Sequence, residues 1–170
     1  LGNLALQTQN FTTSTDSFNT AVGFFAGQQI TTGVKNVLLG SLAGDALTDA
    51  DKNIAIGYLS LSADTLGSHS VSIGNAALAT QNFTTATSSY NVAIGSSAGN
   101  KVTTGTGQTL IGGLAGDAIT TSGNNVAVGT SSMTTNILSA KNVALGVNAL
   151  KTHNQGTATE SFNVAVGHNA

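Results

Sequence analysis

The sequence predicts an all-β fold, a parallel β-solenoid, and three features of the chain lead to that prediction. A glycine recurs at intervals of 17, 17, 17 and 21 residues, and this pattern repeats along the chain. A five-residue phrase such as NVAIG at 91–95 ends on each of these glycines from Gly23 onward. Proline, which cannot donate a hydrogen bond to a sheet, is absent from all 170 residues. A short period kept along the chain indicates one small unit stacked on itself.

The four intervals add up to 72 residues, so residues 19–90 and 91–162 are two copies of a four-coil unit. Partial units lie at both ends, and the chain opens at Leu1 in the middle of a coil. We therefore expect residues 1–170 to be a single repetitive segment of a longer protein. With about 4.8 Å between coils, about ten coils would form a rod about 43 Å long.

Each phrase before a glycine is predicted to form a β-strand with one strongly apolar face. Its second and fourth residues are β-branched or Leu in every copy, which is the alternation of a half-buried strand. We expect columns such as Val37/Leu39 and Ile54/Ile56 to fill the inside of the coil. The middle residue, for example Ala55, would then face the other way.

Two columns mark the ends of the predicted strands and are interpreted as structural. Most strands open with asparagine, whose side chain bonds the local backbone and whose stacked copies form amide ladders. The glycine that closes the strand fits a corner with positive φ. The asparagine column contains Asn36, Asn53, Asn91, Asn125 and Asn142, and the glycine column contains Gly23, Gly40, Gly57, Gly74, Gly95, Gly112, Gly129, Gly146 and Gly167.

The small number of large apolar residues in each coil predicts that the chain associates with copies of itself. Three residues after each glycine comes Ala or Ser, followed by Gly in the first two coils of a unit (Gly27) and by Leu or Met in the last two (Leu61). Two large apolar residues per coil make a thin core against an ordering entropy of about 1–2 kcal/mol per residue. We expect several chains, preferably three, to cover the Ala columns and the Leu/Met column along a shared axis.

Composition excludes several functions. Only 7% of the residues are charged and the net charge is −2, without a basic patch, so we expect no nucleic-acid partner. No apolar run is long enough to insert into a membrane. Cysteine is absent, and no nucleophile–base pair, carboxylate pair or phosphate-binding loop stands out. We therefore predict a protein that is not an enzyme and has no catalytic residue, cofactor or metal site.

Asp45 and Asp117, which match across units, are interpreted as solvated turn residues rather than as ligands of a cation.

Every fourth return to the next strand is four residues longer than the others and is rich in Thr and Ser. These long returns span 7–18, 80–90 and 152–162. Their aromatic residues either pin the longer loop onto the rod or form ridges that contact a sugar or another surface. We favour pinning, because an aromatic residue ends all three returns. The aromatic residues are Phe18, Tyr90 and Phe162 at the ends of the returns, and Phe11 and Phe83 within the first two.

The phrases NVAIGSSA (91–98), SVSIGNAA (70–77) and NVALGVNA (142–149) resemble the repeat of YadA-like head domains of trimeric autotransporter adhesins. They are equally similar to the shaft repeats of bacteriophage tail fibres. The resemblance implies a left-handed parallel β-roll, packed as a homotrimer, on a bacterial cell or virion surface. Adhesin heads have a shorter coil than the 17 and 21 residues found here, which favours the tail-fibre version.

We therefore expect an extracellular structural shaft, in the first place part of a phage tail fibre that spaces and displays a receptor-binding tip. Its partners would be copies of itself and other fibre or virion proteins. One alternative is a bacterial trimeric adhesin head that binds host matrix or cell-surface glycan. Another is an ice-binding solenoid, suggested by threonine pairs such as Thr31-Thr32 and Thr103-Thr104, although this array is broken at Asp49 and Leu66.

Overall fold

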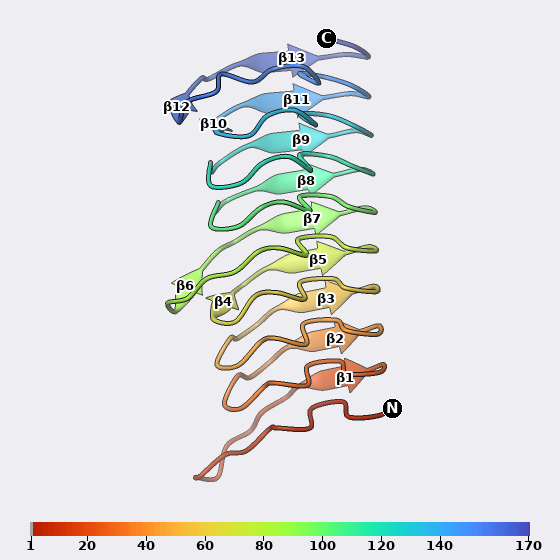
Figure 1. The fold of residues 1–170 in the computed structure, drawn as a ribbon, viewed down its shortest axis with the longest axis vertical. Helices are drawn as coiled ribbons and strands as arrows, with labels where there is room; N and C mark the ends of the chain where they lie inside the picture. Colours follow the sequence, from red (N-terminus) through yellow and green to blue (C-terminus); the bar gives the residue numbers. More distant parts are fainter. Residues whose placement is uncertain (1) are drawn as a thin grey trace.

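The computed structural model describes residues 2–170 and is an all-β parallel solenoid that winds from one end of a rod to the other (Figure 1). Nine three-residue strands, one per turn, form a single sheet in chain order. These strands are β1 (Thr20–Val22), β2 (Val37–Leu39), β3 (Ile54–Ile56), β5 (Val71–Ile73), β7 (Val92–Ile94), β8 (Thr109–Ile111), β9 (Val126–Val128), β11 (Val143–Leu145) and β13 (Val164–Val166). Residues 2–19 contribute no strand, so the rod has nine turns where about ten coils are expected.

The strands stack with equivalent positions directly opposite one another. Leu38 pairs with Ala21 on one side and Ala55 on the other. The longer interval does not shift this register, because Val71 pairs with Val92 across 21 residues. The extra residues leave the stack instead, and the long returns project beyond the shorter ones (Figure 1). Two of the projections carry small parallel pairs, formed by β4 (Gly67–Ser68) with β6 (Thr87–Ser88) and by β10 (Ser139–Ala140) with β12 (Thr159–Glu160).

The strand residues that face the inside of the coil are the opposite set from the one that the sequence predicts. The middle residues, such as Leu38 and Ala55, are fully buried inside the coil. Their neighbours Val37 and Leu39 are 37% and 44% exposed. The prediction that the second and fourth residues of the phrase fill the inside is therefore wrong. The return already places a large residue such as Leu47 or Leu61 inside most coils, so the Val, Ile and Leu columns stand on the outside of the sheet.

The inside is filled by pairs of residues that complement each other in size. Where the fourth residue after the corner glycine is Gly, the seventh is aliphatic, as in Gly44 with Leu47; both are buried. Where the fourth is Leu or Met, the seventh is polar, as in Leu61 with Asp64. A Cβ atom on Gly44 would lie 2.8 Å from side-chain atoms of Leu38 and Leu47, so there is no space for a second large residue.

The Ala columns and the Leu/Met column are buried within the single chain. Ala43, Ala77, Leu61 and Met133 are all inaccessible to solvent. The expectation that neighbouring chains cover these columns is therefore wrong, because the coil itself covers them.

Glycine corners and asparagine ladders hold successive coils together, as the sequence predicts. The corner glycines have φ between 130° (Gly167) and 141° (Gly23), a region that favours glycine. A Cβ atom on Gly57 would also lie 2.5 Å from the carbonyl oxygen of Gly74 in the next coil. In the ladder, the Asn53 N–H donates to Oδ1 of Asn36 at 2.9 Å, and this pattern recurs in most coils.

Candidate interaction surfaces

The most extensive surface feature is an apolar stripe along the outer face of the nine-stranded sheet. We define the apolar stripe as the first and third residues of each of these nine strands. All of them are Val, Ile or Leu except Thr20 and Thr109, and none is charged. With about 4.8 Å between strands and about 3.3 Å per residue, the stripe is about 40 Å long and 10 Å wide. Exposed apolar surfaces of this extent mark sites of association.

Large apolar or aromatic side chains directly follow the corner glycine in three of nine coils, whereas the other six have Ser, Asn, Gly, Thr or His at this position. Phe24, Tyr58 and Val147 each directly follow a corner glycine and are exposed. Phe24 stacks on Phe25, with ring centres 3.9 Å apart. The apolar surface therefore has two adjoining parts, the stripe itself and these residues after the corner.

The aromatic residues of the long returns divide into exposed and buried groups. Phe18, Tyr90 and Phe162 at the ends of the returns are 68%, 63% and 64% exposed, so the prediction that these three residues pin the loops is wrong. Phe83 is only 6% exposed, and Phe11 is half-buried. Phe83 therefore fastens its return and is excluded as a surface contact, whereas the three terminal aromatics stay candidates.

A buried polar cluster lies beneath the return 80–90. Asp64 is fully buried, and its Oδ1 accepts hydrogen bonds from the N–H groups of Gly67 and Phe83, both at 3.0 Å. The Gln81 side-chain amide donates to Oδ2 of Asp64 at 2.6 Å and accepts from Asn91 at 2.8 Å. Burial raises the pKa of Asp64, although these hydrogen bonds lower it in part. The only signal in the sequence is a carboxylate at a position where the other coils have an aliphatic residue or an uncharged polar one.

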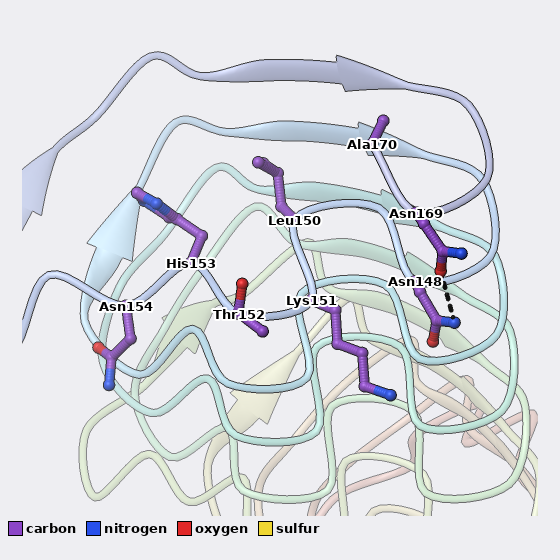
Figure 2. A pocket seen from close by; sticks show the side chains of 8 residues that line it. All are labelled: Asn148, Leu150, Lys151, Thr152, His153, Asn154, Asn169 and Ala170. Atoms are coloured by element: carbon purple, nitrogen blue, oxygen red, sulfur yellow. Dashed lines mark hydrogen bonds between the residues drawn. The ribbon is translucent and has the colours of Figure 1, made fainter.

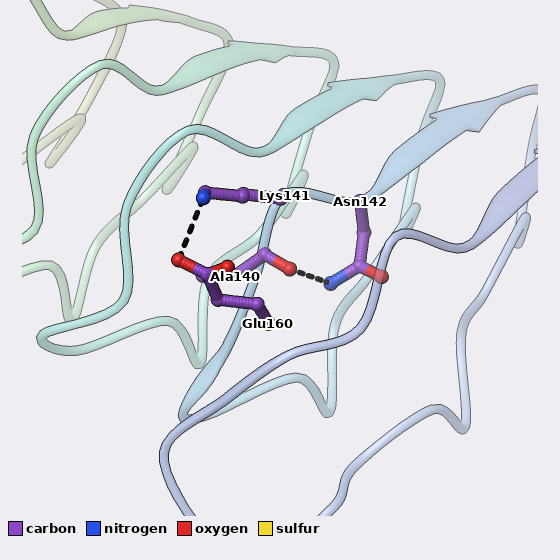
Figure 3. A network of polar contacts seen from close by, with 4 residues as sticks. All are labelled: Ala140, Lys141, Asn142 and Glu160. Carbon is purple, nitrogen blue, oxygen red and sulfur yellow. Dashed lines mark hydrogen bonds and ion pairs between the residues drawn. The ribbon is translucent and has the colours of Figure 1, made fainter.

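At the equivalent place in the second unit, buried Asn136 accepts a hydrogen bond from the Ser139 N–H at 3.0 Å. The second unit also carries an exposed charged pair on its long return. Lys141 forms an ion pair with Glu160 at 2.6 Å, which joins β10 to β12 (Figure 3). The Lys141 ammonium lies 5.3 Å from the centre of the Phe162 ring. In the first unit, the matching residues His69 and Tyr90 have ring centres 5.2 Å apart. Sequence analysis missed both pairs, because their members come from successive coils.

The remaining polar candidates do not form a metal site. Burial raises the pKa of Asp45 and of Asp117, with Lys101 acting in the opposite direction on Asp117. Within residues 2–170, no group of three or more His, Asp or Glu side chains is arranged to hold a metal ion. His153 contacts Asn163 at 3.2 Å and lies far along the chain from His69. Also within these residues, no helix is long and apolar enough to cross a membrane.

Three threonine hydroxyls of the array that suggested ice binding make hydrogen bonds between coils. The hydroxyls of Thr31 and Thr103 each donate to a backbone carbonyl oxygen 17 residues later, at 3.3 Å. Thr120 does the same at 3.2 Å. These donors are therefore occupied in linking coils.

A hollow of about 660 Å³ lies beside the last coil (Figure 2). It is lined by residues 148, 150–154, 169 and 170, and the Asn148 side chain donates to Asn169 at 3.0 Å. We assign no site to it. Comparison of the chain with protein-family models, with curated proteins and with solved structures finds no match.

Proposed function

We propose that this chain is a structural rod of an extracellular surface fibre, in the first place a phage tail-fibre shaft that spaces and displays a receptor-binding tip. In this proposal, copies of the chain assemble through the apolar stripe. The observation that carries the proposal is the uncharged outer face of the sheet, which continues over all nine strands. The resemblance of the repeat to fibre and adhesin repeats supports the setting on a virion or cell surface.

A second copy of the same chain is the occupant that suits the stripe best. The outward side chains repeat at about 4.8 Å, so a partner that matches them along the rod needs the same rise per coil. The stripe covers an area of about 400 Å², taken as its length times its width. Residues after the corner such as Phe24 and Tyr58 add to this area, and a stable interface buries roughly 800 Å² per partner.

The shape of the apolar surface favours three copies over two. The stripe and the apolar residues that follow the corner in three coils adjoin at the glycine column, so one chain offers a continuous apolar part and a second, discontinuous one to two neighbours. Around a three-fold axis, each chain meets two others through different patches, whereas a two-fold dimer uses one self-complementary patch. The mechanical role follows from the asparagine ladder that links most coils and from the parallel sheet that links all nine strands, because both resist bending and local opening.

The solution mass of residues 1–170, measured by light scattering after size exclusion, tests this proposal. We expect three chains per particle. Replacement of Leu39 and Ile94 by Glu puts charges into the stripe and should give single chains that keep the β-type circular dichroism spectrum. The matched control replaces Thr85 and Thr104, which are exposed on the returns, by Glu and should stay trimeric. A monomeric unmodified chain would refute the proposal whether or not the variants fold.

A further inference from the structure

We propose that a ledge beneath the third long return binds a neutral saccharide. The ledge is a hollow of about 400 Å³ on the side of the rod where the returns lie. Its polar lining includes Thr106, Thr121, Asn124, Lys141, Thr159 and Glu160. None of these residues belongs to the apolar stripe, so the inference is independent of self-association.

The repeat itself builds the ledge. β12 pairs with β10, with Glu160 opposite Ala140, so the return 152–162 lies along the return of the preceding coil. Its four extra residues project beyond the shorter returns that precede it (Figure 1). The hollow therefore extends from the projection over residues of three earlier returns, down to Thr106.

One rim of the ledge presents charge, and an aromatic ring lies beside it. The ion pair between Lys141 and Glu160 is at the surface, with 37% and 58% of the two side chains exposed. Each partner keeps hydrogen-bonding capacity, because a carboxylate has about four acceptor positions and an ammonium has three donors. Phe162 is not among the residues that line the hollow, but it lies next to Lys141, which lines it, and most of Phe162 is accessible.

These groups fit the chemistry of a pyranose. Neighbouring sugar hydroxyls donate to the free carboxylate oxygen of Glu160 and accept from the Lys141 ammonium. The C–H face of the sugar packs on the Phe162 ring, as apolar surfaces do on aromatic side chains. Threonine hydroxyls and the Asn124 amide supply further donors and acceptors. The carboxylate on the rim disfavours an anionic ligand, and the polar lining disfavours an apolar one.

The first unit supplies a natural comparison for this site. At the positions of Glu160 and Phe162 it has Ser88 and Tyr90, and at the position of Lys141 it has His69. It therefore has an aromatic residue but lacks the carboxylate and the ammonium. We expect saccharide binding at the ledge of the second unit and not at its counterpart.

Saturation-transfer NMR of residues 1–170 with glucose, galactose and N-acetylglucosamine, each added singly, tests the inference. We expect transfer to at least one of the three. Glu160→Gln and Phe162→Ala should each weaken that binding by about tenfold, because each removes a main contact. Both residues are exposed, so circular dichroism should show an unchanged fold.

The matched controls Ser88→Ala and Tyr90→Ala should leave binding unchanged. Absence of transfer to all three sugars would overturn the inference. So would binding that survives the double variant Glu160→Gln/Phe162→Ala, or binding that depends on Tyr90 and not on Phe162. Because the measurement works on single chains and on trimers alike, its failure is distinguishable from failure of the proposed assembly.

Discussion

The long returns 80–90 and 152–162 occupy equivalent places in the two units, but they are fastened to the rod in different ways. The first is held from inside, by buried Phe83 and by the fully buried carboxylate of Asp64. The second has Gln155 in place of Phe83, and Glu160 joins it to Lys141 at the surface. The repeat therefore sets the length and path of a return, whereas a few residues that break the repeat decide how strongly it is anchored.

The largest difference is expected when the aromatic anchor is removed. Phe83→Ala deletes a buried ring and should lower the free energy of unfolding by about 3–5 kcal/mol. Gln155→Ala, the matched change on the exposed return, should alter it by no more than about 0.5 kcal/mol. Urea unfolding followed by circular dichroism measures both values. Equal effects of the two changes would mean that the returns are anchored alike.

The next largest effect concerns the buried carboxylate. Asp64→Ala leaves the N–H groups of Gly67 and Phe83 without their acceptor, which should cost about 2–4 kcal/mol. Hydrogen exchange of the Phe83 amide should accelerate in this variant. Asp64→Asn introduces the residue that the second unit has at Asn136, and it should cost less because its carbonyl oxygen still accepts. An Asp64→Ala variant as stable as the parent would contradict the role given to this cluster.

Acidification should raise the free energy of unfolding, by less than the two substitutions above lower it. Because burial raises the pKa of Asp64 above its ordinary value of 3.8, the folded state holds a proton at pH values where the unfolded state has lost it. The contribution of Asp64 to stability should therefore increase as the pH falls through the folded pKa toward 3.8, by at most about 1.4 kcal/mol per pH unit. Asp45 and Asp117 act in the same direction.

Urea midpoints measured between neutral pH and pH 4 check this effect, with Asp64→Asn as the comparison. The parent chain should gain more stability on acidification than the variant does. If the variant gained more than the parent, the hydrogen bonds to Asp64 would outweigh its burial, and the direction of its pKa shift would be reversed.

The smallest effect is expected at the surface ion pair. Lys141→Met should cost about 0.2–1 kcal/mol, because both partners are partly exposed to water. Added salt should reduce the difference between this variant and the parent, whereas it should leave the cost of Phe83→Ala unchanged. If Lys141→Met lowered the free energy of unfolding as much as Phe83→Ala does, and added salt did not change that loss, the ion pair and Phe83 would anchor their returns equally strongly.

The sequence was sufficient to predict the stacking, because glycine corners and the asparagine ladder need particular residues at fixed positions. It was not sufficient to predict which strand face is inside. In phrases such as NVAIG both faces are apolar, and the usual burial of large residues pointed the wrong way. The limited space inside the coil is seen only in the structure, where a Cβ atom on Gly44 would collide with the side chains of Leu38 and Leu47. Phe83 is one of the aromatic residues that the sequence marks as possible anchors of a return, whereas Asp64 escaped prediction because its hydrogen-bond partners Gln81 and Phe83 come from another coil.

The most direct test of the account is the accessibility of the apolar stripe in the assembled protein. The chain has no cysteine, so Leu39→Cys and Thr104→Cys each introduce one thiol, at positions that are both exposed in a single rod. If copies pack through the stripe, the thiol at position 39 should react with a water-soluble maleimide much more slowly than the thiol at position 104. The two rates should become equal in denaturant. Equal rates in the native protein would contradict assembly through the stripe.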